Sequence, residues 1–197
     1  MDSGSHAQET DMRPLLFVDT ETTGLRPGYH EIVELCMVKL DHETAYKIEF
    51  PHRTEQTRYY LALPKHIERI DPKAIEVNGF SIAQWITMGA IDIDSVLDEI
   101  SEFMTDCTVV GFNPWFDLRF LIALFGENQP KFNYHAIDLC SVAYPLKIAG
   151  KIKSVSAKGI CEFFGIDYSD AHTASEDVDL SIECYRRLLN YYAGSLP

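Results

Sequence analysis

Short apolar runs separated by polar turns mark the first quarter of the chain. Leu15–Asp19 has the pattern of a buried strand, Glu31–Leu40 is rich in long and β-branched apolar residues, and Ala45–Phe50 alternates apolar with polar positions. Glycine and proline within 24–30 predict a loop between the first two runs, and Asp41–Glu43 predicts a turn before the third. Together these runs predict an antiparallel meander of three strands.

Helical patterns dominate the remainder of the chain. After an irregular segment over 51–70, Asp71 and Pro72 predict the start of a short helix over 72–77, because aspartate is a favourable N-cap and proline suits the first turn. Asn78 and Gly79 are typical of its end. Further helices are predicted over 93–104, 113–125, 138–148, 155–164 and 176–192, and a short buried strand over 107–112.

This order of elements predicts an α/β domain with a mixed sheet, in which a parallel strand joins the antiparallel meander after a helical crossover and helices flank the sheet. A single domain is expected over residues 13–193. Residues 1–12 are polar and are interpreted as a disordered tail or a remnant of cloning.

Composition indicates a globular protein: 197 residues, 46% of them apolar, suffice for one core. No run approaches the ~18 apolar residues of a membrane helix, and the N-terminus does not have the pattern of a secretory signal. The five cysteines include no C-x-x-C pair, so neither a zinc site nor a disulfide framework is favoured. We expect a cytoplasmic, reducing compartment and no membrane association.

The net charge of −13 argues against a protein that coats nucleic acid non-specifically. Two segments are nevertheless locally basic. Residues 131–160 contain five lysines and one acid, and residues 51–73 contain five basic residues and three acids. These segments either guide an anionic ligand or form an ordinary solvated face, and the sequence leaves both interpretations open.

Two acids, Asp19 and Glu21, end the first apolar run. Side chains two apart on a strand point to the same side, so both carboxylates are expected on one face. Like charges this close raise each other's pKa unless something neutralises them. Hard oxygen ligands suit magnesium or manganese. The pair therefore predicts a divalent metal site, and the alternative is a strand that simply runs out into a polar turn.

Two more acids and a histidine lie beside apolar elements further along. Asp117 follows Phe116 next to the apolar stripe of a helix, where an acid is either paired or functional; Arg119 or the helix dipole is the structural alternative. His172 and Asp177 are five residues apart and would not share a helix face. We therefore expect His172 on the loop before the last helix, although taken singly it can be a solvated histidine and Asp177 a first-turn acid.

Taken together, four carboxylates can hold two divalent cations a few ångströms apart. Such a pair can hydrolyse a phosphodiester by activating water and steadying the departing oxygen. A histidine with a pKa near ~6.5 is suited to take the proton from that water.

The sequence resembles the DEDDh subgroup of 3′–5′ exonucleases, which includes the proofreading epsilon subunit of bacterial DNA polymerase III, ribonuclease T and oligoribonuclease. Three segments carry the resemblance, Val18–Leu25, Gly111–Asp117 and Ala171–Asp177, and Asp71–Gly79 is similar to a helix between the first two family motifs. The resemblance covers about residues 14–190. It implies an RNase H-like fold with a mixed five-stranded sheet, an antiparallel meander plus parallel strands flanked by helices, and two Mg²⁺ or Mn²⁺ ions.

The resemblance also implies roles for the five polar residues. Asp19 would bridge both metals, Glu21 and Asp177 would complete the shell of the first, Asp117 would act directly or through water, and His172 would be the general base. Phe112 occupies a position where many members have histidine, which affects substrate preference more than chemistry. Substrate contacts are expected from Thr22, Thr23, Gly24, Leu25, Phe112, Asn113, Trp115, Phe116, Lys151 and Lys153. Trp115 is expected either to face the substrate or to anchor the start of its helix.

The leading hypothesis is a metal-dependent 3′–5′ exonuclease that releases nucleoside 5′-monophosphates from single-stranded 3′ ends, of DNA rather than RNA. The alternative within the enzymes is an exoribonuclease acting on short RNA or RNA 3′ ends. A hypothesis of another class is a catalytically silent nucleic-acid binding module. The oligomeric state is left open, with a homodimer or association with a polymerase as the alternatives.

Overall fold

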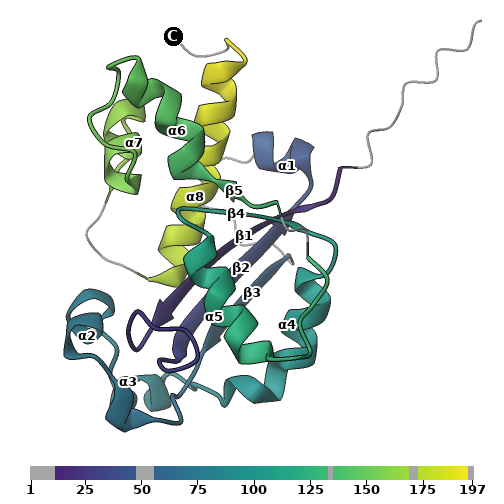
Figure 1. Cartoon of the computed structure of the whole chain (residues 1–197), viewed down its shortest axis with the longest axis vertical. Coiled ribbons are helices and arrows are strands. Elements are labelled where there is room, and N and C mark those ends of the chain that lie inside the picture. The colour runs from purple at the N-terminus through teal and green to yellow at the C-terminus, as the bar shows by residue number, and fades with distance from the viewer. Residues whose placement is uncertain (1–11, 48–55, 133–134, 169–172, 195–197) are drawn as a thin grey trace, which may run out of the picture.

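A central mixed sheet organises the structure, a computed structural model that describes residues 12–47, 56–132, 135–168 and 173–194 (Figure 1). Its strands are β1 (Leu15–Thr22), β2 (Ile32–Leu40), β3 (Thr57–Leu61), β4 (Thr108–Gly111) and β5 (Ile137–Asp138). They are arranged in the order β3-β2-β1-β4-β5. β1 is central, antiparallel to β2 and parallel to β4. The predicted five-stranded mixed sheet is therefore confirmed.

Helices cover the sheet in the order the sequence predicts, with short additions. They are α1 (His42–Lys47), α2 (Pro72–Asn78), α3 (Ile82–Thr87), α4 (Leu97–Met104), α5 (Trp115–Phe125), α6 (Leu139–Ile148), α7 (Ala157–Phe164) and α8 (Ala174–Tyr192), with 3₁₀ turns at Ile67–Arg69 and Ile93–Val96. The Asp71 side chain accepts from the Lys73 amide at the start of α2, and Gly79 ends that helix in the left-handed conformation, as predicted. No helix in the described ranges has the length and apolar character needed to cross a membrane.

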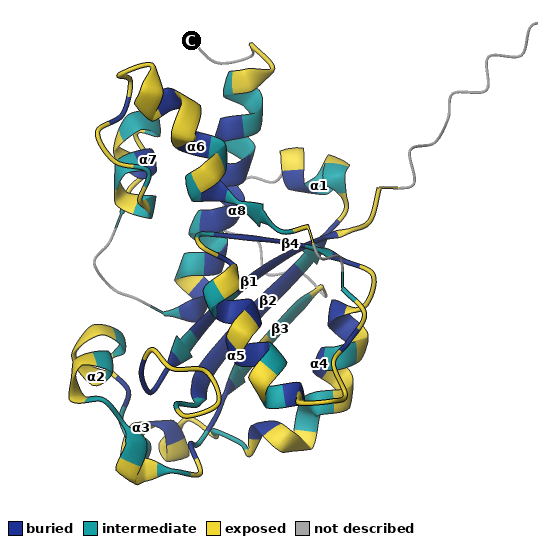
Figure 2. Cartoon of the chain, in the orientation of Figure 1, coloured by how far each residue is buried: buried dark blue, intermediate teal, exposed yellow. Residues whose placement is uncertain are grey.

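Alternation along β1 divides the core between the two faces of the sheet. Leu15 and Phe17 pack in a cluster with residues of α6, α7 and α8, whereas Leu16 and Val18 pack with residues of α4 and α5. Figure 2 shows β1 and β2 largely buried between helices whose outer surfaces are exposed. Because the period of a strand is two, Asp19 continues the Leu15–Phe17 row and lies on the face that α8 covers.

The strand predicted over Ala45–Phe50 and the turn predicted at Asp41–Glu43 are wrong. His42–Lys47 is the helix α1, and residues 48–50 lie outside the described part of the chain. Asp41 accepts hydrogen bonds from the amide and the hydroxyl of Thr44, which fixes a helical first turn. Ala45 is fully buried and belongs to the α8-side core cluster. Local capping and this packing outweigh the apolar alternation.

Besides α1 and the 3₁₀ turn Ile67–Arg69, three elements were not predicted. β3 lies in the segment interpreted as irregular, although Thr57–Leu61 is rich in aromatic and β-branched residues. β5 consists of only two residues, which is too short for a periodic signal. α3 is a helix of six residues whose buried Trp85 donates from its ring nitrogen to the Val33 carbonyl at 2.7 Å. The predicted strand over 107–112 is confirmed as β4.

A buried glutamate, Glu34 on β2, joins the sheet to the start of α8. It is only 2% exposed and lies directly opposite Glu21 in the β1–β2 register. Its Oε1 accepts from the Ala174 amide at 3.1 Å. Burial raises the pKa of Glu34, and hydrogen bonds from Tyr59, Ala174 and Ser175 act in the opposite direction. A carboxylate at a helix N-terminus satisfies amides that have no partner within the helix.

Replacing Glu34 with alanine is expected to destabilise the fold, because the first amides of α8 would lose a buried acceptor. We expect Glu34→Ala to lower the free energy of unfolding by about 1–3 kcal/mol, measured as a shift of the urea midpoint at pH 7. The matched control is Glu43→Ala on α1, whose exposed carboxylate pairs with Lys47; a change within about 0.5 kcal/mol is expected there. Equal midpoints for the two variants would contradict this role of Glu34.

Candidate active site

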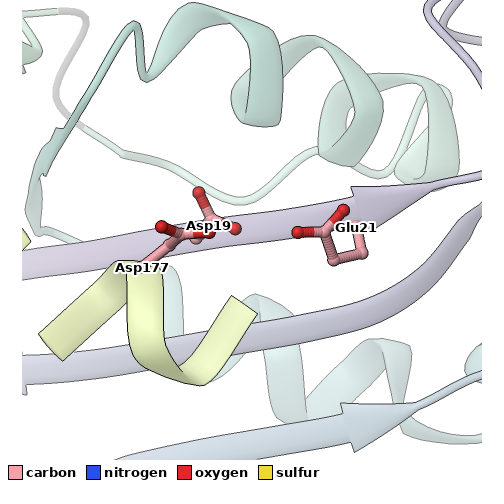
Figure 3. A group of neighbouring side chains, drawn as sticks. All are labelled: Asp19, Glu21 and Asp177. Atoms are coloured by element: carbon pink, nitrogen blue, oxygen red, sulfur yellow. The ribbon is translucent and has the colours of Figure 1, made fainter. Parts of the chain in front are cut away.

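Three carboxylates converge at the carboxyl end of β1 (Figure 3). Asp19 and Glu21 extend from one face of the strand, and Asp177 reaches the same place from the first turn of α8. One ligand oxygen of each lies within 4.8 Å of the others. The sequence separation of more than 150 residues between the strand and the helix is thus closed by the packing of α8 on the sheet.

The fourth predicted acid, Asp117, is buried in the first turn of α5 with 3% of its surface exposed. Its Oδ1 accepts from the amide of Thr20 at 2.9 Å and from the hydroxyl of Thr20 at 2.7 Å. Thr20 lies between Asp19 and Glu21 on β1, and successive side chains of a strand point to opposite faces of the sheet. The Thr20 side chain therefore faces α5, whereas the two acids face α8. The structural partner of Asp117 is therefore Thr20, and Arg119 instead donates to the Trp115 carbonyl.

The carboxylates resist joint ionisation. Burial raises the pKa of Asp19 well above its usual range, and the charges of Asp117 and Asp177 add to the effect. Burial, followed by the charges of Asp177 and Glu34, raises the pKa of Glu21 to about 8. The pKa of Asp117 rises to about 7, mainly through burial, although the Thr20 hydrogen bonds oppose this. The charges that act most on these groups are those of other acids, so a bound cation would lower the pKa values of all three.

The donor set fits a hard divalent cation. Two oxygens bound to one Mg²⁺ at about 2.1 Å are at most about 4.2 Å apart. The oxygens of Asp19, Glu21 and Asp177 lie within 4.8 Å of one another, so small side-chain movements complete the geometry. All three ligands are carboxylates without sulfur or imidazole, which favours magnesium or manganese.

Three residues that support this site were not identified from the sequence: Thr20, Glu34 and Asn78. The Asn78 side chain donates to the Thr22 carbonyl at 3.0 Å and also hydrogen-bonds Glu21, which lowers the pKa of that carboxyl. From the sequence, Asn78 is interpreted only as a residue that ends the helix over 72–77. The one available signal was its place in Asp71–Gly79, the segment similar to a helix between the family motifs.

The residues that follow Glu21 form a tightly bonded turn. The Thr22 hydroxyl donates to the Gly24 carbonyl at 2.7 Å, and the Thr23 hydroxyl accepts from the Glu31 amide at 2.9 Å. Gly24 is required because a Cβ there would lie 2.5–2.6 Å from the His30 ring. Leu25 is 75% exposed. Of the four predicted contacts in this turn, Leu25 therefore presents the open side chain.

The second predicted segment surrounds the start of α5. Phe112 is half-buried against the α8-side core, and Phe116 packs on Phe120 with ring centroids 5.0 Å apart. Asn113 has a φ of +50° and its amide donates to Asp138 at 3.1 Å. Trp115 is 44% exposed, so its ring is available to a ligand.

Two predicted contacts lie away from the acids. Lys151 and Lys153 belong to the connection between α6 and α7 (Figure 1), and the Lys151 ammonium is 5.4 Å from the ring centroid of Tyr191. Tyr191 follows Asp177 by fourteen residues of α8, or about 21 Å of helix. A contact from these lysines stays a prediction for a distant part of a ligand. The predicted general base His172 lies outside the described residues.

A family model described as an exonuclease, RNase T, matches residues 16–185. The chain is 24% identical to the DNA polymerase III subunit epsilon of Aquifex aeolicus over 176 residues, which covers 87% of this chain and 78% of that protein. It is 27% identical over 164 residues to the 3′-5′ exonuclease DinG of Staphylococcus epidermidis, covering 81% of this chain and 16% of that one.

The fold is also similar to that of solved exonuclease I. A TM-score of 0.71 at 18% identity covers 93% of this chain and 44% of that one. A structure of E. coli exonuclease I in complex with a dT13 oligonucleotide gives a TM-score of 0.68 at 18% identity, and covers 91% of this chain and 43% of that one. The chain thus spans less than half of exonuclease I and about a sixth of DinG. The family match extends across the sheet, the acid cluster and most of α8, and the chain belongs to the RNase T exonuclease family.

Proposed function

We propose that the chain is a metal-dependent 3′–5′ exonuclease, which hydrolyses phosphodiester bonds at single-stranded 3′ ends and releases nucleoside 5′-monophosphates. The observation that carries this proposal is the convergence of Asp19, Glu21 and Asp177 within 4.8 Å. The raised pKa values of Asp19 and Glu21 support binding of a cation, and the family match supports the reaction class. Two Mg²⁺ or Mn²⁺ ions are the cofactors proposed.

Each polar residue has a proposed task. Asp19, Glu21 and Asp177 hold the cations, which when bound activate a water molecule and stabilise the departing oxygen. Asp117 is held by Thr20, and its Oδ2 is the oxygen proposed to act directly or through water. Asn78 and Glu34 position Glu21 and the start of α8. His172 is the proposed general base for the attacking water.

DNA is the substrate that the relatives favour. The epsilon subunit belongs to a DNA polymerase, and solved exonuclease I structures include complexes with dT13 and dA16 oligonucleotides. The exposed Leu25, four residues after Glu21, and Trp115, two residues before Asp117, offer apolar surface on which a terminal base can stack or wedge. Such contacts are tolerant of base identity. An exoribonuclease acting on short RNA is the alternative, since a 2′-hydroxyl is what such a site can sense.

Association with a polymerase is a further proposal. It is supported by the similarity to the epsilon subunit over 78% of that protein. A homodimer is the alternative assembly.

The proposal predicts stepwise shortening of a 5′-labelled single-stranded oligonucleotide from its 3′ end when Mg²⁺ is present. EDTA should stop the reaction. Asp19→Asn should reduce the rate at least ~1,000-fold, or about 4 kcal/mol of transition-state stabilisation, because a central ligand is lost. Digestion of DNA and RNA oligonucleotides of the same sequence, resolved side by side on denaturing gels, shows whether the enzyme prefers deoxyribose or ribose.

The matched control for Asp19→Asn is Asp98→Asn, an exposed acid in the first turn of α4. This variant should degrade DNA at the wild-type rate. Internal cuts at random positions would contradict exonuclease action. Metal-independent binding without any turnover would identify a silent binding module instead.

Stability without metal should fall as pH rises. The pKa of Glu21 is raised to about 8 and that of Asp117 to about 7, so between their usual values near 4 and these values the folded state binds more protons than the unfolded state. Unfolding temperature in EDTA is therefore expected to decrease from pH 5 to pH 8, and added Mg²⁺ should raise it most at pH 8. Thermal denaturation at several pH values measures both effects.

The double variant Glu21→Gln, Asp177→Asn tests the source of this slope. Because two of the interacting carboxylates are removed, the unfolding temperature in EDTA should decrease less from pH 5 to pH 8. Mg²⁺ should no longer raise the unfolding temperature of this variant. A wild-type protein that is equally stabilised by Mg²⁺ at pH 5 and pH 8 would contradict the linkage.

A further inference from the structure

A cationic and aromatic cluster lies on the loop between β1 and β2, which follows the acid-bearing end of β1, and on the 3₁₀ turn that precedes α2. The guanidinium carbon of Arg26 is 4.7 Å from the Tyr29 ring centroid, and that of Arg69 is 5.1 Å from the same centroid. Tyr29 is 40% exposed and Arg26 is exposed. Two guanidinium groups thus share one accessible aromatic ring in a protein with a net charge of −13.

The positive charge of this cluster is largely uncompensated. The ion pair of Arg69 is with Glu68 at 3.8 Å, and 70% of the Glu68 side chain is exposed, so water screens it. In the described part of the chain, no carboxylate forms an ion pair with Arg26. Both guanidinium groups therefore keep donors for an external anion.

The loop that carries Arg26 and Tyr29 is rigidly folded. The Arg26 carbonyl accepts from the amides of Tyr29 at 3.1 Å and His30 at 2.8 Å, and the Arg26 amide donates to His30 Nδ1 at 2.9 Å. Gly28 packs toward Ala123 of α5. A preformed arrangement of this kind binds a ligand with little ordering of the protein.

Hydrogen bonds tie the cluster to the end of β1 that carries the acids. The Thr23 amide donates to the Glu31 carbonyl and the Asp71 amide donates to the Thr23 carbonyl, both at 2.8 Å. Tyr29 is two residues from Glu31, Arg69 is two residues from Asp71, and Glu21 is two residues from Thr23. Each such step of two residues spans at most about 7 Å. A single-stranded nucleic acid whose 3′ end lies at Glu21 can therefore reach the cluster within a few nucleotides.

A pocket of about 230 Å³ adjoins the cluster. Its lining includes the polar or charged side chains of Tyr29, His30, Lys65 and Arg69 and the apolar side chains of Phe120 and Leu124 of α5. Two acids also line it, but Glu31 is bonded to the amides of Lys65 and His66, and Asp94 pairs with Lys65. The pocket is smaller than the 300–1,000 Å³ typical of drug-sized ligands, and its combination of an apolar wall with cations suits one base and its phosphate.

We propose that Arg26, Tyr29 and Arg69, with the pocket beside them, form a subsite for the upstream part of a single-stranded nucleic acid, several nucleotides from the bond that is cleaved. The guanidinium groups bind phosphates, and the Tyr29 ring and the pocket receive bases. This inference rests on the proposed exonuclease function. Its consequence is a dependence of KM on substrate length.

The test compares one-nucleotide and oligonucleotide substrates. For the double variant Arg26→Ala, Arg69→Ala, we expect KM for a dT12 oligonucleotide to rise about tenfold or more with kcat unchanged. Hydrolysis of the p-nitrophenyl ester of thymidine 5′-monophosphate, which is too short to reach the cluster, should stay within twofold of wild type. The slope of log(kcat/KM) against log salt for dT12 should fall by about 1.4, since each phosphate contact on a single strand contributes about 0.7.

The control is Arg13→Ala, an exposed arginine just before the opposite end of β1, which should match wild type on both substrates. Tyr29→Phe keeps the ring and should also match wild type, whereas Tyr29→Ala should raise KM for dT12 alone. An unchanged KM for dT12 in the double variant, or an equal loss on the short ester, would overturn the subsite.

A binding measurement separates this inference from the proposed function. Fluorescence anisotropy of labelled dT12 in EDTA reports binding without turnover, and the double variant is expected to bind at least tenfold more weakly than wild type. Failure of wild type to hydrolyse either substrate would reject the exonuclease proposal. Equal affinity of wild type and the double variant for dT12 would reject the subsite.

Discussion

Mutual repulsion among partly buried carboxylates is the constraint around which this structure is organised. Oxygens of Asp19, Glu21 and Asp177 lie within 4.8 Å of one another, and burial together with the charges of neighbouring acids raises the pKa values of Asp19 and Glu21. Such a group is unfavourable for the fold alone, because like charges repel one another more strongly where water is partly excluded. Divalent cations bound there, as proposed above, would offset this repulsion.

The alternation of side chains along β1 determines which helices face these carboxylates. Odd-numbered residues of β1 face α8 and even-numbered residues face α4 and α5. The same alternation that buries Leu15 and Leu16 on opposite faces sends Asp19 toward Asp177 and Thr20 toward Asp117. Glu34, on the neighbouring strand, holds the first amides of α8 and so fixes where Asp177 enters. β1 therefore meets one acid from each helical layer, Asp177 of α8 beside Asp19 and Glu21, and Asp117 of α5 at Thr20.

Much of this could be predicted from the sequence because the signals were local. The spacing of Asp19 and Glu21 determines a shared face once a strand is assumed, and apolar stripes identify most helices. The strand predicted over Ala45–Phe50 was wrong because the hydrogen bonds of Asp41 to Thr44 favour a helix there. Glu34 was not identified as a support of the site because its partner, Ala174, is 140 residues away, and a single sequence contains no local mark of such a contact.

Diffraction from crystals soaked in Mn²⁺, measured at the manganese absorption edge, tests the central claim most directly. The account predicts an anomalous peak between the carboxylates of Asp19, Glu21 and Asp177, with oxygens about 2.2 Å from the ion. A second peak on the side of Asp117 would fit the two-metal proposal. A map without any peak at the end of β1, with the three carboxylates turned away from one another, would contradict it.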